Sequence, residues 1–195
     1  MKAEVPAAAA SPAEGQWVEA ELVRSLLRTA RTTQLLGLFL IPILIGVLWN
    51  DIDWEPLAVW AAFAVGFAAV RFAVMRQYAR EVQPLGAAEH LAFFARYRLL
   101  WPVSALVWGS STLLYFDRSS LADQFICWLM LAGVAMFAIN ALSTHLPTLR
   151  AYLDTLALTA LAVILWRLGL ELVKDVAVDL EDIHHILLCL GVLQG

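Results

Sequence analysis

Few side chains in this sequence combine polar chemistry with the apolar surroundings of a membrane site. The densest group within long apolar runs lies between Leu99 and Leu142, and its members are Trp108, Ser110, Ser111, Thr112 and Asn140. A buried amide can bind a ligand or hydrogen bond to a neighbouring helix, and hydroxyls commonly bond back to their own helix. We predict a ligand-binding site at Trp108, Ser111 and Asn140, with helix packing as the alternative role.

Motifs for catalysis or metal binding are missing from the sequence. It contains no HExxH pair, no glycine-rich phosphate loop and no nucleophile elbow. His184 and His185 would point about 100° apart on a helix, which makes a shared metal ion difficult. They are either interfacial histidines or a pH-sensitive edge beside an acidic segment. We assign no catalytic residue, metal or cofactor, and whether the full-length protein is an enzyme stays open.

Composition favours a membrane protein. Of the 195 residues, 62% are hydrophobic and 15% are charged, whereas soluble domains have about 45–50% apolar and about 25% charged residues. A water-soluble core cannot account for this excess, because a chain of this size still needs a polar surface. No basic tract suggests a nucleic-acid partner. We therefore predict an all-α, polytopic membrane protein in contact with lipids.

Six apolar runs are predicted to cross the bilayer, each crossing taking about 20 residues. Their approximate ranges are 33–49, 56–75, 99–116, 121–142, 151–170 and 183–195. An acidic segment, Glu171–Asp182, separates the last two and is expected to leave the membrane. The sixth run is incomplete, because a helix from Ile186 to Gly195 rises only ~15 Å. We expect either a re-entrant helix or, preferably, a fragment of a longer protein.

The residues before the first run fall into two parts. Residues 1–15 are rich in Ala, Pro and Glu and are predicted to be disordered. Residues 16–32 are predicted to form an amphipathic helix with one apolar and one basic face, formed by Val18, Leu22 and Leu26, and by Arg24, Arg28 and Arg31. This helix either lies on an anionic membrane surface or extends the first spanning helix.

Side chains near the span ends carry further expectations. Arg71 is expected to snorkel to the lipid headgroups. Small residues make the second run a predicted packing face, at Ala61, Ala62, Gly66 and Ala69. Five tryptophans are predicted to form an interfacial aromatic belt: Trp49, Trp54, Trp60, Trp101 and Trp166.

The distribution of basic residues predicts the orientation. Of the thirteen lysines and arginines, only Arg118, Arg167 and Lys174 lie on the side that follows the first, third and fifth runs. The positive-inside rule therefore places the N-terminus in the cytoplasm, with the sixth run returning there.

The chain resembles the six-helix N-terminal membrane region of bacterial sensor histidine kinases and diguanylate cyclases. The resemblance covers about Arg24 to the end. It rests on four short motifs: Tyr97-Arg98 before the third run, Trp108-Gly109 within it, Leu131-Ala132-Gly133 in the fourth, and Leu146-Pro147 leading to Arg150.

This resemblance implies a sensory domain in the bacterial inner membrane, with the histidine kinase type favoured and a diguanylate cyclase as the alternative. It also implies a homodimer and a cytoplasmic output domain in the same polypeptide, absent from this chain. With short extracytoplasmic segments, we expect a lipophilic or membrane-proximal signal. A small transporter or channel subunit is the alternative from another class, and it predicts inverted repeats and a polar path, neither of which the sequence shows.

Overall fold

The computed structural model describes residues 12–192, and it places the side chains of residues 15–29 and 37–174. Within the described range the regular elements are all helices, without a strand, which confirms the all-α class. The predicted disordered tail lies mostly outside the described residues. Its last part is helical, because the first helix already begins at Pro12.

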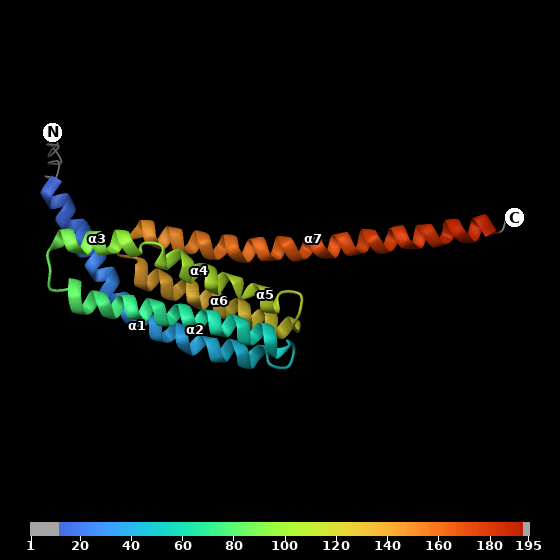
Figure 1. Cartoon of the computed structure of the whole chain (residues 1–195), viewed down its shortest axis with the longest axis horizontal. Helices are drawn as coiled ribbons and strands as arrows, with labels where there is room; N and C mark the ends of the chain where they lie inside the picture. The colour runs from blue at the N-terminus through green and yellow to red at the C-terminus, as the bar shows by residue number, and fades with distance from the viewer. Residues whose placement is uncertain (1–11, 193–195) are drawn as a thin grey trace, which may run out of the picture.

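Five long helical segments lie side by side and alternate in direction, as Figure 1 shows. A short helix, α3 (Ala87–Tyr97), lies at one end of this bundle, and the last helix projects beyond the other end. The elements are α1 (Pro12–Leu48), α2 (Trp54–Gln77), the π-helical turn η1 (Tyr78–Val82), α3 (Ala87–Tyr97), α4 (Leu100–Ser110), α5 (Thr112–Tyr115), α6 (Leu121–Leu142) and α7 (Leu146–Val192).

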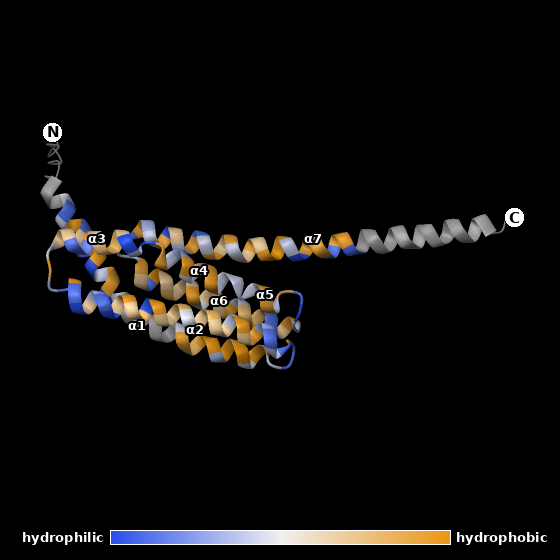
Figure 2. Cartoon of the chain, viewed as in Figure 1, coloured by the Kyte–Doolittle hydropathy of each residue, from blue (hydrophilic) through white to orange (hydrophobic). Residues whose placement is uncertain are grey.

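The bundle has the length and surface of a membrane protein. Among the residues whose side chains are described, three stretches are long and apolar enough to cross a bilayer, namely Trp54–Val82, Leu121–Leu142 and Leu146–Lys174. Most of the bundle's ribbon is coloured as hydrophobic in Figure 2. Many large apolar side chains are exposed, including Phe39, Ile43, Val59, Phe63, Phe125, Leu129, Met136, Leu158 and Leu165. In water such a surface would aggregate, whereas in lipid it is the favourable one. The chain is therefore a helical membrane protein.

Two predicted spans are built from shorter pieces. The first is the C-terminal part of α1, of which Gly37–Leu48 is a shorter apolar helix. The third is divided between α4 and α5 at Ser111, whose backbone N–H donates to the Trp108 carbonyl at 3.1 Å and tightens the turn. The hydroxyls of Ser110 and Ser111 also donate to backbone carbonyls one turn back, at 2.8 and 2.6 Å.

The fifth and sixth predicted runs are not separated by a break in the helix. Instead α7 is one helix of 47 residues, which includes both runs up to Val192 and the whole acidic segment. Glu171–Asp182 contains neither proline nor glycine, and charge alone does not end a helix. Six separate crossings thus stay a prediction. The side chains of His184 and His185 lie outside the described ones.

At its start, α7 begins at Leu146, before the fifth run predicted at 151–170. Pro147 sits in the first turn, where its missing N–H costs nothing. The His145 ring nitrogen Nδ1 accepts a hydrogen bond from the backbone N–H of Thr148 at 3.3 Å and so caps the helix.

The N-terminal part of α1 continues directly into the first span, as the second of the two sequence interpretations expected. It packs on the bundle through Val23, Leu26 and Leu27, which are buried with Phe93 of α3 in one hydrophobic cluster. Of the predicted apolar face only Leu26 is buried, since Val18 and Leu22 are 50% and 40% exposed. Docking onto α3 selects the buried stripe, and a helical wheel cannot foresee that neighbour.

Two hydrophobic clusters make up the core. One lies toward the end of the bundle where α3 is found, and it includes Trp101 and Tyr152. The other lies toward the end where α1 and α2 meet, and it includes Trp60 and Tyr115. Trp108 packs against both clusters, which places it at the junction where the cavity described below is found.

Candidate ligand cavity within the bundle

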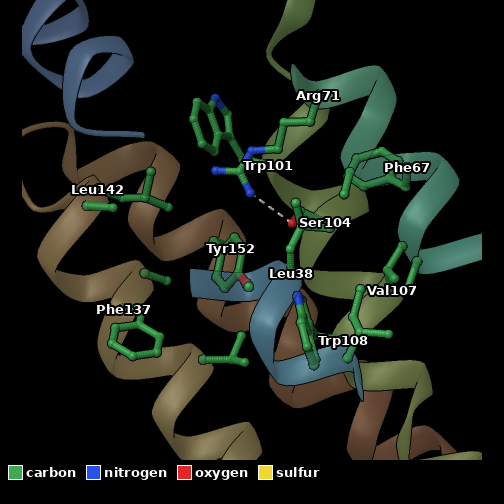
Figure 3. A pocket seen from close by; sticks show the side chains of 17 residues that line it. Leu38, Phe67, Arg71, Trp101, Ser104, Val107, Trp108, Phe137, Leu142 and Tyr152 are labelled. Atoms are coloured by element: carbon green, nitrogen blue, oxygen red, sulfur yellow. Dashed lines mark hydrogen bonds between the residues drawn. The ribbon is translucent and has the colours of Figure 1, made fainter. Parts of the chain in front are cut away.

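A cavity of about 70 Å³ lies between α1, α2, α4, α6 and α7. Figure 3 shows its labelled side chains converging from these helices. The lining residues are Gly37, Leu38, Ile41, Ala64, Phe67, Ala68, Arg71, Trp101, Ser104, Val107, Trp108, Val134, Phe137, Ala138, Ala141, Leu142 and Tyr152. Most are apolar, and the polar ones gather toward the α3 end of the bundle.

Arg71 supplies the charge at the polar end. Its side chain turns into the bundle, where Nη1 donates to the Ser104 hydroxyl at 3.2 Å (Figure 3) and the guanidinium lies 4.6 Å from the centre of the Trp101 ring. The predicted snorkelling of Arg71 to the headgroups is therefore wrong. A hydrogen-bond acceptor and an aromatic face on α4 hold the cation inside.

No carboxylate among the described side chains neutralises Arg71. The ion pairs among the described side chains are Arg24–Glu21, Arg150–Asp154 and Lys174–Glu171, and each is an exposed pair within a single helix. The Arg71 Nε is buried and has no hydrogen-bond partner. Arg71 as a whole is half-buried. Desolvating a cation without a counter-ion is costly, so an arginine in this position inside a membrane protein indicates a functional site.

Tyr152 brings α7 into the polar end. Its side chain faces the cavity and lies close enough to Arg71 and Ser104 to interact with both. Tyr152 is itself only 5% exposed. The polar end thus offers a cation and two hydroxyl groups, contributed by three different helices.

The other end of the cavity is apolar and is organised by Trp108. Its ring meets that of Trp60 edge to face, with centroids 5.7 Å apart and an interplanar angle of 69°. The Trp60 Nε1 donates to the Val107 carbonyl at 3.2 Å, which fixes this pair. Gly37 brings α1 close, because a Cβ built there would lie 3.9 Å from the Trp108 ring.

Of the three predicted site residues, the cavity includes Trp108 alone. The Ser111 hydroxyl is buried and donates to the Trp108 carbonyl of its own helix. Asn140 is exposed, and its Nδ2 donates to the Met136 carbonyl one turn back at 3.1 Å. The structure does not bring these three side chains together. Ligand contact through Ser111 or Asn140 stays a prediction. Ser111 makes the hydrogen bond to its own helix that was its alternative role, whereas Asn140 bonds to its own helix and not to a neighbouring one.

Sequence reasoning missed Arg71, Trp101, Ser104 and Tyr152. One signal was present, because Arg71 lies within the apolar run 56–75, and an ionisable residue inside such a run marks a functional site by default. Trp101 and Ser104 are three residues apart and thus share a face of α4. Which helix that face meets is set by the packing of the bundle.

Three of the five tryptophans of the predicted aromatic belt are exposed, and two are not. Trp49, Trp54 and Trp166 are 62%, 67% and 54% exposed. Trp60 and Trp101 are buried in the bundle, which corrects the prediction for both. The Trp60 ring packs against Trp108 and the Trp101 ring against Arg71 instead. A position near the end of a predicted span was therefore not enough to identify an exposed tryptophan.

Comparison with known proteins gives no match, either to a protein family, to a curated protein or to a solved structure. The described residues also contain no group of His, Cys, Asp and Glu side chains that could hold a metal ion. The class that the fold and cavity define is therefore a helical membrane protein with an internal, cation-bearing cavity.

Proposed function

We propose that this chain is the membrane-embedded sensory domain of a bacterial signal-transduction receptor, in which a lipophilic ligand binds in the Trp108 cavity. One observation carries the proposal: the cavity holds Arg71, a half-buried cation that has no described counter-ion and whose Nε is buried without a hydrogen-bond partner. Such a cation by itself lowers the stability of the folded protein, and a role in ligand recognition explains why it is kept there. The resemblance of the sequence to sensory membrane regions supports the same reading.

The helix α7 is suited to transmit ligand binding. It contributes Tyr152 to the cavity wall and continues as one helix far beyond the bundle (Figure 1). It also packs tightly on α4, since a Cβ at Gly109 would lie 2.8 Å from the Thr159 Cβ. A ligand that moves Tyr152 would therefore shift or tilt α7 as a rigid body.

The type of receptor follows from the resemblance. A histidine kinase is favoured and a diguanylate cyclase is the alternative, with the output domain in the same polypeptide and the receptor acting as a homodimer. Ala62, Gly66 and Ala69 of the predicted packing face are exposed on α2 and so are available to a second copy.

The proposed topology places the α3 end of the bundle in the cytoplasm of a bacterial inner membrane, as the positive-inside rule indicates. Five segments of the bundle would cross the bilayer. A cytoplasmic output domain requires one more crossing after α7 leaves the bundle, and the apolar run from 183 is the segment proposed for it. Because that run continues α7 away from the bundle up to Val192 (Figure 1), the proposed crossing requires α7 to bend after it leaves the bundle.

Ligand binding can be tested with a brominated alcohol, 11-bromoundecanol, because bromine quenches tryptophan fluorescence on contact. The full chain in phosphatidylcholine nanodiscs should show saturable quenching that Trp108→Phe diminishes. Ala138→Phe fills the cavity and should abolish it. Ala132→Phe is the matched control, because Ala132 lies on the same helix but is exposed outside the cavity.

Quenching that rises linearly with the bromoalcohol, or that is equal in the Ala138→Phe variant, would contradict the proposal. A small transporter or channel subunit makes a different prediction, namely solute flux across proteoliposomes. Flux that Ala138→Phe blocks would replace the sensory function with transport.

A further inference from the structure

The polar end of the cavity carries information about the ligand's head group. We infer that the ligand is an anionic amphiphile, an alkyl carboxylate, whose carboxylate is bound by Arg71 and whose chain lies against Trp108. This inference rests on the proposed function, since it concerns the same cavity. It adds the chemical class of the ligand.

The first argument is charge. Arg71 is the single ionisable cation among the lining residues, and no described carboxylate pairs with it. Its Nε is buried and makes no hydrogen bond, while Nη1 is already bound to Ser104. A carboxylate would supply both the missing counter-charge and the missing acceptor, and planar guanidinium–carboxylate pairs are among the strongest hydrogen-bonded pairs in proteins.

The second argument is the direction of the polarity. Trp101, Ser104 and Trp108 follow one another along one face of α4, and Trp101 and Trp108 are about 10 Å apart along its axis. The polar residues lie toward the α3 end, and the apolar Trp108 lies deeper in the bundle. Arg71 is about 9 Å along α2 from its last residue, Gln77. An amphiphile in a bilayer has this polarity, with its head near the interface and its chain toward the middle.

The third argument is size. A cavity of about 70 Å³ accepts a head group and the first part of a chain, but not a whole lipid. Leu38, Phe67 and Phe137 are half-buried lining residues, so the rest of the chain would lie against them and reach the surrounding lipid.

Alkyl phosphates share the anionic chemistry but fit less well. A phosphomonoester carries about −1.5 to −2 charges at neutral pH, and this site offers one cation. One carboxylate and one guanidinium neutralise each other, which avoids leaving an uncompensated charge in the bundle.

The experiment compares three probes of equal chain length in phosphatidylcholine nanodiscs containing the full chain: 11-bromoundecanoate, 11-bromoundecanol and 11-bromoundecyl phosphate. At pH 8 the carboxylic acid is ionised, because its pKa in water is close to that of a Glu side chain. Saturable quenching of tryptophan fluorescence is measured against the mole fraction of each probe in the bilayer. We expect half-saturation by the carboxylate at a concentration lower by about tenfold or more than for the alcohol or the phosphate.

The role of Arg71 is tested with Arg71→Gln, which removes the charge, and Arg71→Lys, which keeps it without the planar fork. The glutamine variant should bring the carboxylate to within about twofold of the alcohol, while the lysine variant should retain part of the difference. Arg76→Gln is the matched control, because Arg76 is exposed on the same helix and does not line the cavity. It should leave all three curves unchanged.

The outcomes separate the two proposals. Saturable binding of the alcohol and the carboxylate with equal affinity in the unsubstituted chain would overturn the carboxylate inference and leave the proposed function standing. Tightest binding of the phosphate would overturn it in favour of a phosphate head group. Absence of saturable binding by every probe would overturn the proposed function itself. The probe comparison needs no substitution, so it stays decisive even if an Arg71 variant fails to fold.

Discussion

At the scale of single residues, Arg71 is the most informative side chain of this protein. It could have reached the headgroup region, yet it turns inward onto Trp101 and Ser104. Those two contacts offset part of the free-energy cost of desolvating the guanidinium. The buried Nε makes no hydrogen bond and therefore offsets none of that cost. A residue kept at such a cost is expected to serve binding more than stability.

This expectation gives a stability prediction. Arg71→Met keeps the apolar stem and removes the buried charge, so without ligand its melting temperature in detergent should equal or exceed that of the unsubstituted chain. Leu131→Ala is the comparison, because Leu131 is buried in the same cluster as Trp101 and truncating a buried leucine leaves a destabilising void. A fall for Arg71→Met as large as that for Leu131→Ala would show that Arg71 is structural.

A second residue-scale prediction concerns Ser111 and Asn140. Both side chains hydrogen bond to their own helices, so Ser111→Ala and Asn140→Ala should change bromoundecanol half-saturation by less than about twofold. Trp108→Ala removes a wall of the cavity and should weaken binding by about tenfold, read as probe quenching of the remaining tryptophans. Weakened binding in either of the first two variants would restore the site predicted from sequence.

At the scale of helices, the contact between α4 and α7 is the one on which the proposed transmission depends. Gly109 lets the two backbones approach, because a Cβ there would lie 3.0 Å from the Leu156 carbonyl oxygen as well as 2.8 Å from the Thr159 Cβ. Thr159 cannot simply turn away, since its own hydroxyl donates to the Thr155 carbonyl. Small residues at such contacts are typical of helix packing in membranes.

The Gly109→Ala substitution tests this contact. It should push α4 and α7 apart and lower stability by about 1–3 kcal/mol, seen as a lower melting temperature in detergent. Gly133→Ala is the control on α6, where nothing lies within 4 Å of the added Cβ, and it should leave stability unchanged or slightly raised. Equal melting temperatures for the two variants would contradict a tight α4–α7 contact.

At the scale of the whole molecule, the two ends of the bundle differ in charge. The turn between α1 and α2 carries Asp51 and Asp53, and the Asp51 carboxylate accepts a hydrogen bond from the backbone N–H of Ser120 at 2.6 Å. That bond ties the two turns of this end together. The opposite end carries Arg96 and Arg98 at the junction of α3 and α4.

Orientation is tested by labelling single cysteines in intact cells with a membrane-impermeant maleimide, in a background with Cys127 and Cys189 replaced by alanine. Asp53→Cys should react from outside, and Arg96→Cys only after the membrane is permeabilised. Both positions are exposed in the structure. Reaction of both from the same side would contradict the proposed topology.

The sequence by itself determined the class and most of the helices of this protein. Runs of apolar residues can only be helices in lipid, since each backbone polar group must be satisfied within its own segment. That rule predicted α6 at Leu121–Leu142 with the observed bounds. It did not foresee that the fifth and sixth runs belong to one helix, because charged residues can continue a helix and α7 runs through the acidic segment.

Only the tertiary structure decided where side chains point. Nothing in the sequence favoured one of Trp108, Ser111 and Asn140 over the others. The rotation of each helix in the bundle places only Trp108 of these three in the cavity wall. The sequence placed Arg71 near the end of an apolar run, and the position of α4 beside α2 turned it inward. Helical periodicity says which residues share a face, but the neighbour of that face depends on contacts between residues far apart in the chain.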